Sequence, residues 1–171
     1  MNVGRVVSPT FATRNMPTSP VIKPARYLAE YDHGVDDKRR VQVPAKWRPP
    51  EGEQDGFEIM LCQWQLPGQP PCLLALPPAA CQEMDARIRA LPFGDPEAEK
   101  LRRILSGISD VVTLDGAGRI CLPQKLAEAA QIKTKAILVG MWDRFQLWSP
   151  DNYAKVKSAD AADAAKVMKL I

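Results

Sequence analysis

The sequence predicts an α+β protein built from two copies of one β-rich unit that are joined by helices. A pattern occurs twice, as VDDKRRVQVPAKW from Val35 and as LDGAGRICLPQKL from Leu114. Short apolar runs with strand-like alternation lie around each copy. Two segments with helical periodicity lie between the copies. Because a repeated pattern usually reports a repeated structure, we expect two matched halves.

Residues 1–26 are predicted to form a disordered basic arm. They contain several prolines, many Ser and Thr residues, and basic but no acidic side chains. Such a segment buries too little apolar surface to fold by itself. The arm is either a solvated tail or a supplementary phosphate-binding segment.

Residues 27–77 are expected to form the first repeat. The predicted elements are strands ending at 31–34 and spanning 41–43, 57–64 and 72–76, and a polar turn at 36–40. Pro44 is expected to open a short helix, because proline suits the first helical position.

Residues 78–106 are expected to link the two repeats through two helices, at 79–91 and 96–105. In the first of these, Cys81, Met84 and Ile88 recur at helical spacing and form one apolar stripe. A linker of this kind separates the two repeats in sequence without breaking their common core.

Residues 107–157 are expected to form the second repeat. The predicted elements are strands at 111–113, 120–122, 136–141 and 145–148, a turn at 115–119 and a short helix at 123–130. Ser149 followed by Pro150 is a helix start signal. The alanine-rich tail at 158–171 is predicted to be helical.

The composition excludes several classes of protein. No run approaches the roughly 18 apolar residues of a membrane span, and no secretory signal is recognised, so we expect a cytoplasmic protein. With a single histidine, no C-x-x-C pair and no nucleotide-binding or hydrolase motif, we expect no metal, no cofactor and no enzymatic activity. The net charge of +3 permits nucleic-acid binding without requiring it.

Each repeated turn carries an aspartate four positions before an arginine. Arg40 and Arg119 are the best candidates for base or phosphate contact, because a guanidinium donates two parallel hydrogen bonds in a fixed fork. Asp36 and Asp115 are expected to accept N–H bonds within their own turns or to orient these arginines. The alternative for each arginine is a purely structural ion pair.

Further basic side chains near the turns are predicted to hold the phosphate backbone; these are Lys38, Arg39, Lys46, Arg48 and Lys125. The second copy carries fewer charges than the first. We therefore expect the two turns to contribute unequally.

At this point the sequence resembles the MraZ family. The string YDHGVDDKRR at 31–40 with PAKWR at 44–48 is similar to its first signature, and DGAGR at 115–119 with Leu122 and Pro123 is similar to its second. The resemblance covers about residues 27–157. It implies two AbrB-like swapped-hairpin halves that form a double-split β-barrel.

The resemblance also implies a function. Members of this family regulate transcription of the division and cell wall gene cluster. They bind double-stranded DNA, at short direct repeats in their own promoter, as ring-shaped homo-oligomers. The turns at 36–40 and 115–119 would be the DNA-contacting loops, and the protein would associate with the nucleoid.

The sequence departs from the family pattern at Arg39, where glycine is usual, at Cys81, where tryptophan is usual, and in the additional N-terminal arm. Glycine suits a left-handed backbone position, so either the first turn is remodelled or Arg39 adds a contact. A rival function remains on the same fold. AbrB-like antitoxins capture a toxin with an extra segment, and the alanine-rich C-terminal segment could serve that purpose.

Overall fold

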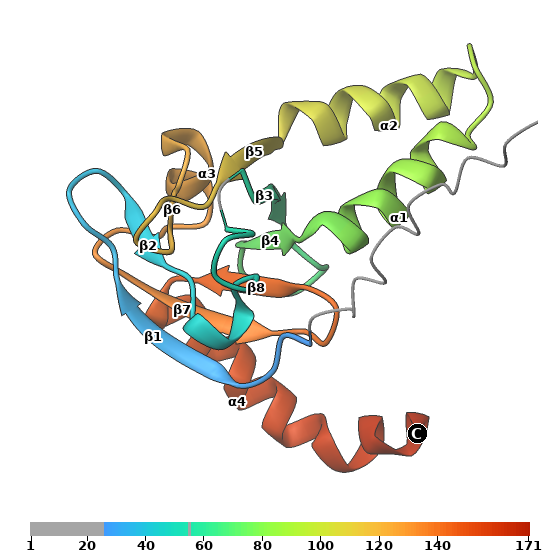
Figure 1. Cartoon of the computed structure of the whole chain (residues 1–171). Helices are drawn as coiled ribbons and strands as arrows, with labels where there is room; N and C mark the ends of the chain where they lie inside the picture. Colours follow the sequence, from blue (N-terminus) through green and yellow to red (C-terminus); the bar gives the residue numbers. More distant parts are fainter. Residues whose placement is uncertain (1–25, 55) are drawn as a thin grey trace, which may run out of the picture.

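The computed structural model describes residues 26–54 and 56–171 (Figure 1). Its strands are β1 Glu30–Gly34, β2 Arg40–Gln42, β3 Glu58–Trp64, β4 Cys72–Leu76, β5 Ser109–Thr113, β6 Arg119–Cys121, β7 Lys135–Gly140 and β8 Phe145–Trp148. Its helices are α1 Pro78–Arg89, α2 Pro96–Gly107, α3 Gln124–Ala129 and α4 Pro150–Val167, with 3₁₀ turns η1 Ala45–Trp47 and η2 Met168–Leu170. The predicted α+β class is confirmed. The predicted N-terminal arm, apart from Arg26, lies outside the described residues.

The strands have an internal two-fold pseudo-symmetry. Six of them form an antiparallel sheet in the order β1-β7-β8-β4-β3-β5, and β2 pairs with β6 in a separate two-stranded ribbon. The first strand of each repeat pairs with the third strand of the other repeat, β1 with β7 and β5 with β3. Replacing each strand by its counterpart in the other repeat gives the same order read backwards.

The resemblance led us to expect a double-split β-barrel. In the described part of the chain the six-stranded sheet is open and no hydrogen-bonded barrel closes. The ribbon nevertheless packs onto the sheet, because Val41 and Ile120 of the ribbon are fully buried in the same cluster as Leu61 and Leu138. Both repeats therefore share one hydrophobic core.

An aromatic group anchors the first repeat in this core. Trp47 of η1 is 2% exposed, its ring lies 5.1 Å from those of Tyr31 and Phe145, and its Nε1 donates to the Leu28 carbonyl at 3.1 Å. The sequence predicts Pro44 inside this helix, whereas Pro44 is the cap residue just before it. Its ψ of 136° is extended, so the helical turn begins one residue later.

The helices α1 and α4 occupy equivalent places in the two repeats. Each begins directly after the fourth strand of its repeat, with a proline at its first position. Ala80 of α1 packs against Leu74 and Leu76, and Val156 of α4 packs against Trp148. Figure 1 shows α1 and α2 running side by side and projecting from the sheet. They leave the β2–β6 ribbon uncovered.

Candidate nucleic-acid interface

The first loop, residues 36–40, is closed by its aspartate. Asp36 Oδ1 accepts the backbone N–H groups of Lys38 at 2.9 Å and of Arg40 at 2.8 Å. The Arg39 N–H donates to the Asp36 carbonyl at 2.8 Å. The N–H from the Arg40 backbone is the main reason why the pKa of the Asp36 carboxyl is lowered. The charged carboxylate is therefore part of the fold of this loop.

The second loop, residues 115–119, repeats this arrangement bond for bond. Asp115 Oδ1 accepts the N–H groups of Ala117 and Arg119, both at 2.9 Å. The Gly118 N–H donates to the Asp115 carbonyl at 2.8 Å. The pKa of Asp115 is lowered as well, first by the N–H of Arg119. The two loops thus share one conformation despite their different sequences.

Each aspartate also orients the arginine of its loop. Arg40 Nε donates to Asp36 Oδ2 at 2.7 Å, and Arg119 Nε donates to Asp115 Oδ2 at 3.0 Å. The arginine side chains are 35% and 32% exposed. In the described residues no other protein atom accepts a hydrogen bond from either guanidinium. The terminal amino groups of both forks are therefore held in place but available to a ligand.

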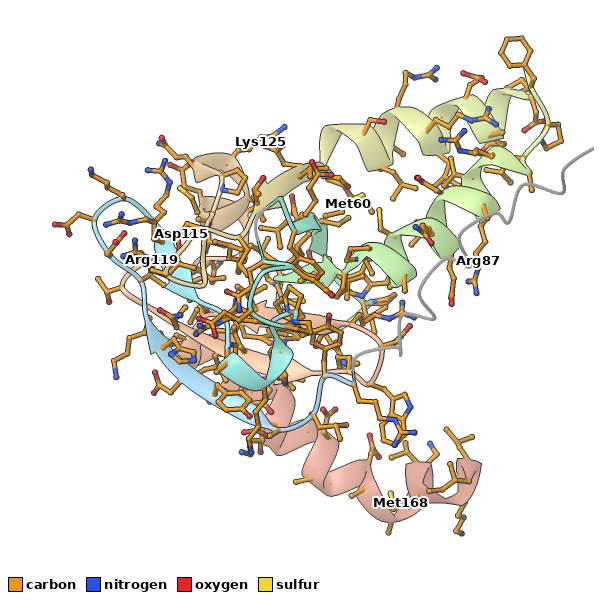
Figure 2. All side chains as sticks on the ribbon, viewed as in Figure 1. Met60, Arg87, Asp115, Arg119, Lys125 and Met168 are labelled. Carbon is orange, nitrogen blue, oxygen red and sulfur yellow. The ribbon has the colours of Figure 1, made fainter. Side chains whose placement is uncertain are left out.

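The β2–β6 ribbon brings the two loops to one surface. Successive residues of a strand face opposite sides, and the central pair, Val41 and Ile120, is fully buried. The other four residues share the outer face as two cross-strand pairs, Arg40 with Cys121 and Gln42 with Arg119. Figure 2 shows Asp115 and Arg119 close together at this end of the molecule. Both arginines therefore project from a single short ribbon.

Side chains of β2 and β6 each donate hydrogen bonds to the loop of the other repeat. Gln42 Nε2 donates to the carbonyls of Ala117 at 2.8 Å and Gly118 at 3.0 Å. At the equivalent position, Cys121 Sγ donates to the Lys38 carbonyl at 3.2 Å. Our sequence reasoning did not single out Gln42 or Cys121. The alternation around Val41 already places Gln42 on the polar face, which is the signal that could have found it.

Arg39 replaces glycine without remodelling the first loop. Its φ is 60°, and that of Gly118 at the equivalent position is 75°. Arg39 Nε donates to the Leu122 carbonyl at 3.0 Å, so Arg39 adds a contact. The counterpart carbonyl, of Val43, accepts from Arg48 Nε at 2.7 Å. The two repeats therefore satisfy equivalent carbonyl groups with arginines from different positions.

The missing side chain at Gly118 explains why Arg48 serves the second repeat. A Cβ atom at Gly118 would overlap the Arg48 guanidinium group. Arg48 can lie there only because position 118 has no side chain. Arg39 and Arg48 thus have structural contacts through Nε, and both side chains are half-buried.

The predicted lysines are not all gathered at the ribbon. Lys38 is exposed within the first loop. Lys46 and Lys125 are exposed at equivalent positions of η1 and α3. Lys125 Nζ donates to the Gly107 carbonyl at 3.0 Å, at the end of α2 (Figure 2). The ribbon therefore brings together Arg40, Arg119 and Lys38, while Lys46 and Lys125 lie on the flanking helical turns.

The described residues contain no group of three or more His, Cys, Asp or Glu side chains arranged to hold a metal ion. In the same part of the chain, no helix combines the length and apolar character that a bilayer crossing requires. The exposed polar groups of the ribbon are the best candidate site within these residues.

The sequence of this chain is similar to that of several known proteins. A family model that describes the MraZ protein, and calls it antitoxin-like, matches residues 107–169. The transcriptional regulator MraZ of Roseiflexus sp. strain RS-1 is 36% identical over 140 residues, which are 81% of this chain and 92% of that protein. The protein of the same name from Herpetosiphon aurantiacus is 37% identical over 139 residues, 81% and 91% of the two chains. That of Pseudomonas putida is 33% identical over 128 residues, 75% and 83% of the two chains. The chain therefore belongs to the MraZ family.

Proposed function

We propose that this protein is a sequence-specific DNA-binding transcriptional regulator of the division and cell wall gene cluster. It binds double-stranded DNA at short direct repeats in its own promoter, in the cytoplasm and at the nucleoid. The relatives described above carry the name transcriptional regulator MraZ. The observation that carries the proposal is the outer face of the β2–β6 ribbon, where two pre-oriented arginines lie on one exposed surface.

The ribbon suits a DNA groove in its size and its chemistry. A two-stranded β ribbon fits the major groove of B-form DNA. An arginine there can donate both bonds of its fork to guanine O6 and N7, or to a phosphate. Asp36 and Asp115 hold the Nε atoms of Arg40 and Arg119, so the forks are ordered before DNA arrives. Lys38, with a flexible single charge, serves the phosphate backbone.

The proposal includes a ring-shaped homo-oligomer. One pair of short loops offers few contacts, whereas linked copies on tandem repeats gain affinity when the spacing matches. Within each subunit of the ring, the six-stranded sheet and the β2–β6 ribbon would together form the double-split β-barrel. Sedimentation of the purified protein tests the ring, because a monomer over the whole concentration range at which DNA is bound would exclude it.

The test of the function is DNA binding measured by fluorescence anisotropy at about 0.15 M salt. A duplex from upstream of the gene is compared with a scrambled duplex. Arg40→Ala and Arg119→Ala should each weaken binding to the upstream duplex by about 5- to 150-fold, the range of one bidentate base contact. Arg103→Ala is the matched control, because this exposed arginine lies on α2, away from the ribbon.

Circular dichroism of each variant checks that the fold is kept. Equal, weak binding to both duplexes that neither loop variant changes would overturn the proposed function.

One observation favours the rival function. The chain end after α4 exposes apolar side chains: Met168 is 64% exposed, and Leu170 and Ile171 are almost fully exposed. An antitoxin could offer such a segment to a toxin. Failure of DNA binding, together with a small toxin gene beside this one, would favour that alternative, whereas a neighbouring methyltransferase and division genes would favour the regulator.

A further inference from the structure

The first loop lies beside a segment of the second repeat. The N–H of Val35, the residue before this loop, donates to the Thr134 carbonyl at 2.8 Å. Gly34 pairs with Lys135 at the end of β1 and β7. Figure 1 shows the chain that enters β7 next to the loop between β1 and β2. The strand exchange thus brings Lys133 and Lys135 to the edge of the first loop.

The second loop has an equivalent neighbour in the first repeat. The Leu114 N–H donates to the Phe57 carbonyl at 3.0 Å, and Thr113 pairs with Glu58. Because Leu114 is the counterpart of Val35, Glu58 stands beside the second loop where Lys135 stands beside the first. The pseudo-symmetry therefore holds for the backbone but reverses the charge at this position.

The charge difference extends along both segments. Residues 131–135 contain Lys133 and Lys135 and no acidic residue. Residues 51–58 contain several acidic residues and no lysine or arginine. The side chains of Lys133, Lys135 and Glu58 are all exposed. The segment beside the first loop is thus basic and the segment beside the second is acidic, while the carboxylates of Asp32, Glu128 and Asp151 also lie near the two lysines.

Neither lysine is committed to a strong ion pair. Lys135 Nζ lies 3.8 Å from Asp32, and the two side chains are 62% and 59% exposed. An exposed pair at that distance contributes little and yields readily to a phosphate. Among the described residues, Lys133 forms no salt bridge.

We propose that Lys133 and Lys135 bind DNA phosphates beside the first loop, and that the contrast with Glu58 makes the first loop the stronger DNA contact, so that each subunit binds its site in one orientation. This inference rests on the proposed function. A protein unit with true two-fold symmetry matches a palindromic site. A unit whose two halves differ in flanking charge lacks this symmetry and matches a non-palindromic site, in which the base sequence sets the direction. Subunits that all face the same way require direct repeats.

Salt dependence of binding tests the phosphate contacts. Each neutralised phosphate contributes about 0.9 to the slope of log affinity against log salt. The double variant Lys133→Ala, Lys135→Ala should reduce this slope by about 2 and weaken binding roughly 30-fold at about 0.15 M salt. The loss should be similar for upstream and scrambled duplexes, since phosphates carry no sequence information. The matched control, Lys100→Ala with Lys155→Ala, removes two exposed lysines from α2 and α4 and should leave the slope unchanged.

The orientation of the DNA repeats tests the second part of the proposal, that each subunit binds its site in one orientation. Wild-type protein should prefer two direct repeats to the same repeats placed head to head. A variant with Lys133→Ala, Lys135→Ala and Glu58→Gln should lose most of this preference while keeping its preference for the upstream sequence.

If wild-type protein binds the upstream duplex but the double lysine variant keeps both slope and affinity, the inference is wrong and the proposed function stands. If wild-type protein does not bind DNA selectively, both fail. An unchanged preference for direct repeats in the triple variant would overturn the second part alone.

Discussion

The two loops have the same backbone and different surroundings. In both, an aspartate accepts two N–H bonds and a left-handed residue precedes the arginine. Yet that residue is Arg39 in one loop and Gly118 in the other, and the neighbouring strand brings Lys135 to the first and Glu58 to the second. The comparison teaches that a few local contacts fix the conformation, while the charge around it varies independently.

The largest difference between equivalent residues of the two repeats should be in how much each contributes to the stability of the protein. Trp47 and its counterpart Leu126 are both buried, but only Trp47 contacts several aromatic rings and donates a hydrogen bond from its side chain. Trp47→Ala should cost about 3–5 kcal/mol in free energy of unfolding, and Leu126→Ala should cost less, within a range of about 2–5 kcal/mol. Urea denaturation followed by circular dichroism measures both. An equal loss would show that the first repeat is no better anchored than the second.

Substituting the two residues with left-handed backbone, Arg39 and Gly118, should reveal a smaller difference in stability. Gly118→Ala places a side chain at a φ of 75° and displaces the Arg48 guanidinium, so we expect a loss of about 1–3 kcal/mol. Arg39→Gly relieves a similar backbone strain but removes the bond to Leu122, so its net effect should stay within about 1 kcal/mol. Chemical denaturation compares the two. A stable Gly118→Ala variant beside a destabilised Arg39→Gly variant would contradict this prediction.

The hydrogen bonds that Gln42 and Cys121 donate to the other repeat should differ less in their contribution to stability. Gln42 donates to two carbonyl groups, so Gln42→Ala should cost about 0.5–1.5 kcal/mol in unfolding free energy. Cys121 has only a thiol, which is a weak donor, and Cys121→Ala should change stability by less than about 0.5 kcal/mol. Thermal melting of both variants beside wild type measures this, and a larger loss for Cys121→Ala would contradict it.

The smallest expected effect concerns pH. The pKa of Asp36 and that of Asp115 are lowered on folding, so both carboxylates stabilise the protein above their unfolded pKa of about 3.9. This contribution is lost as the pH falls through the lower folded values. The double variant Asp36→Asn, Asp115→Asn should therefore lose less stability than wild type below about pH 4. Asp37→Asn, an exposed neighbour, is the control and should follow wild type.

Much of the fold could be predicted because its signals are local. The repeated turns, the apolar alternation at Val41 and the cap at Ser149 depend on neighbouring residues, and the structure has turns, strands and a helix there. The pairing of β1 with β7 could not be derived from residue patterns, because the residues that meet there are far apart in sequence. Only the family resemblance implied it, through its swapped hairpins.

The candidate site was predictable in its residues more than in its arrangement. Arg40 and Arg119 stand out by repetition alone. That Arg48 fills the space over Gly118, or that Lys133 lies at the edge of the first loop, follows from contacts between distant segments. Local spacing carries no information about such contacts, so only the three-dimensional structure reveals them.

The exchange of strands between repeats has a consequence for protein synthesis. Among the described residues β1 pairs with β7 alone, so a nascent chain that has completed the first repeat still lacks the strand that pairs with Glu30–Gly34. Contacts between such distant segments form late and slowly. We expect both loops to acquire their shape in the same step, after nearly the whole chain has left the ribosome. A chain ending at Gly107 should then show no cooperative unfolding transition, and a clear transition would disprove this order of events.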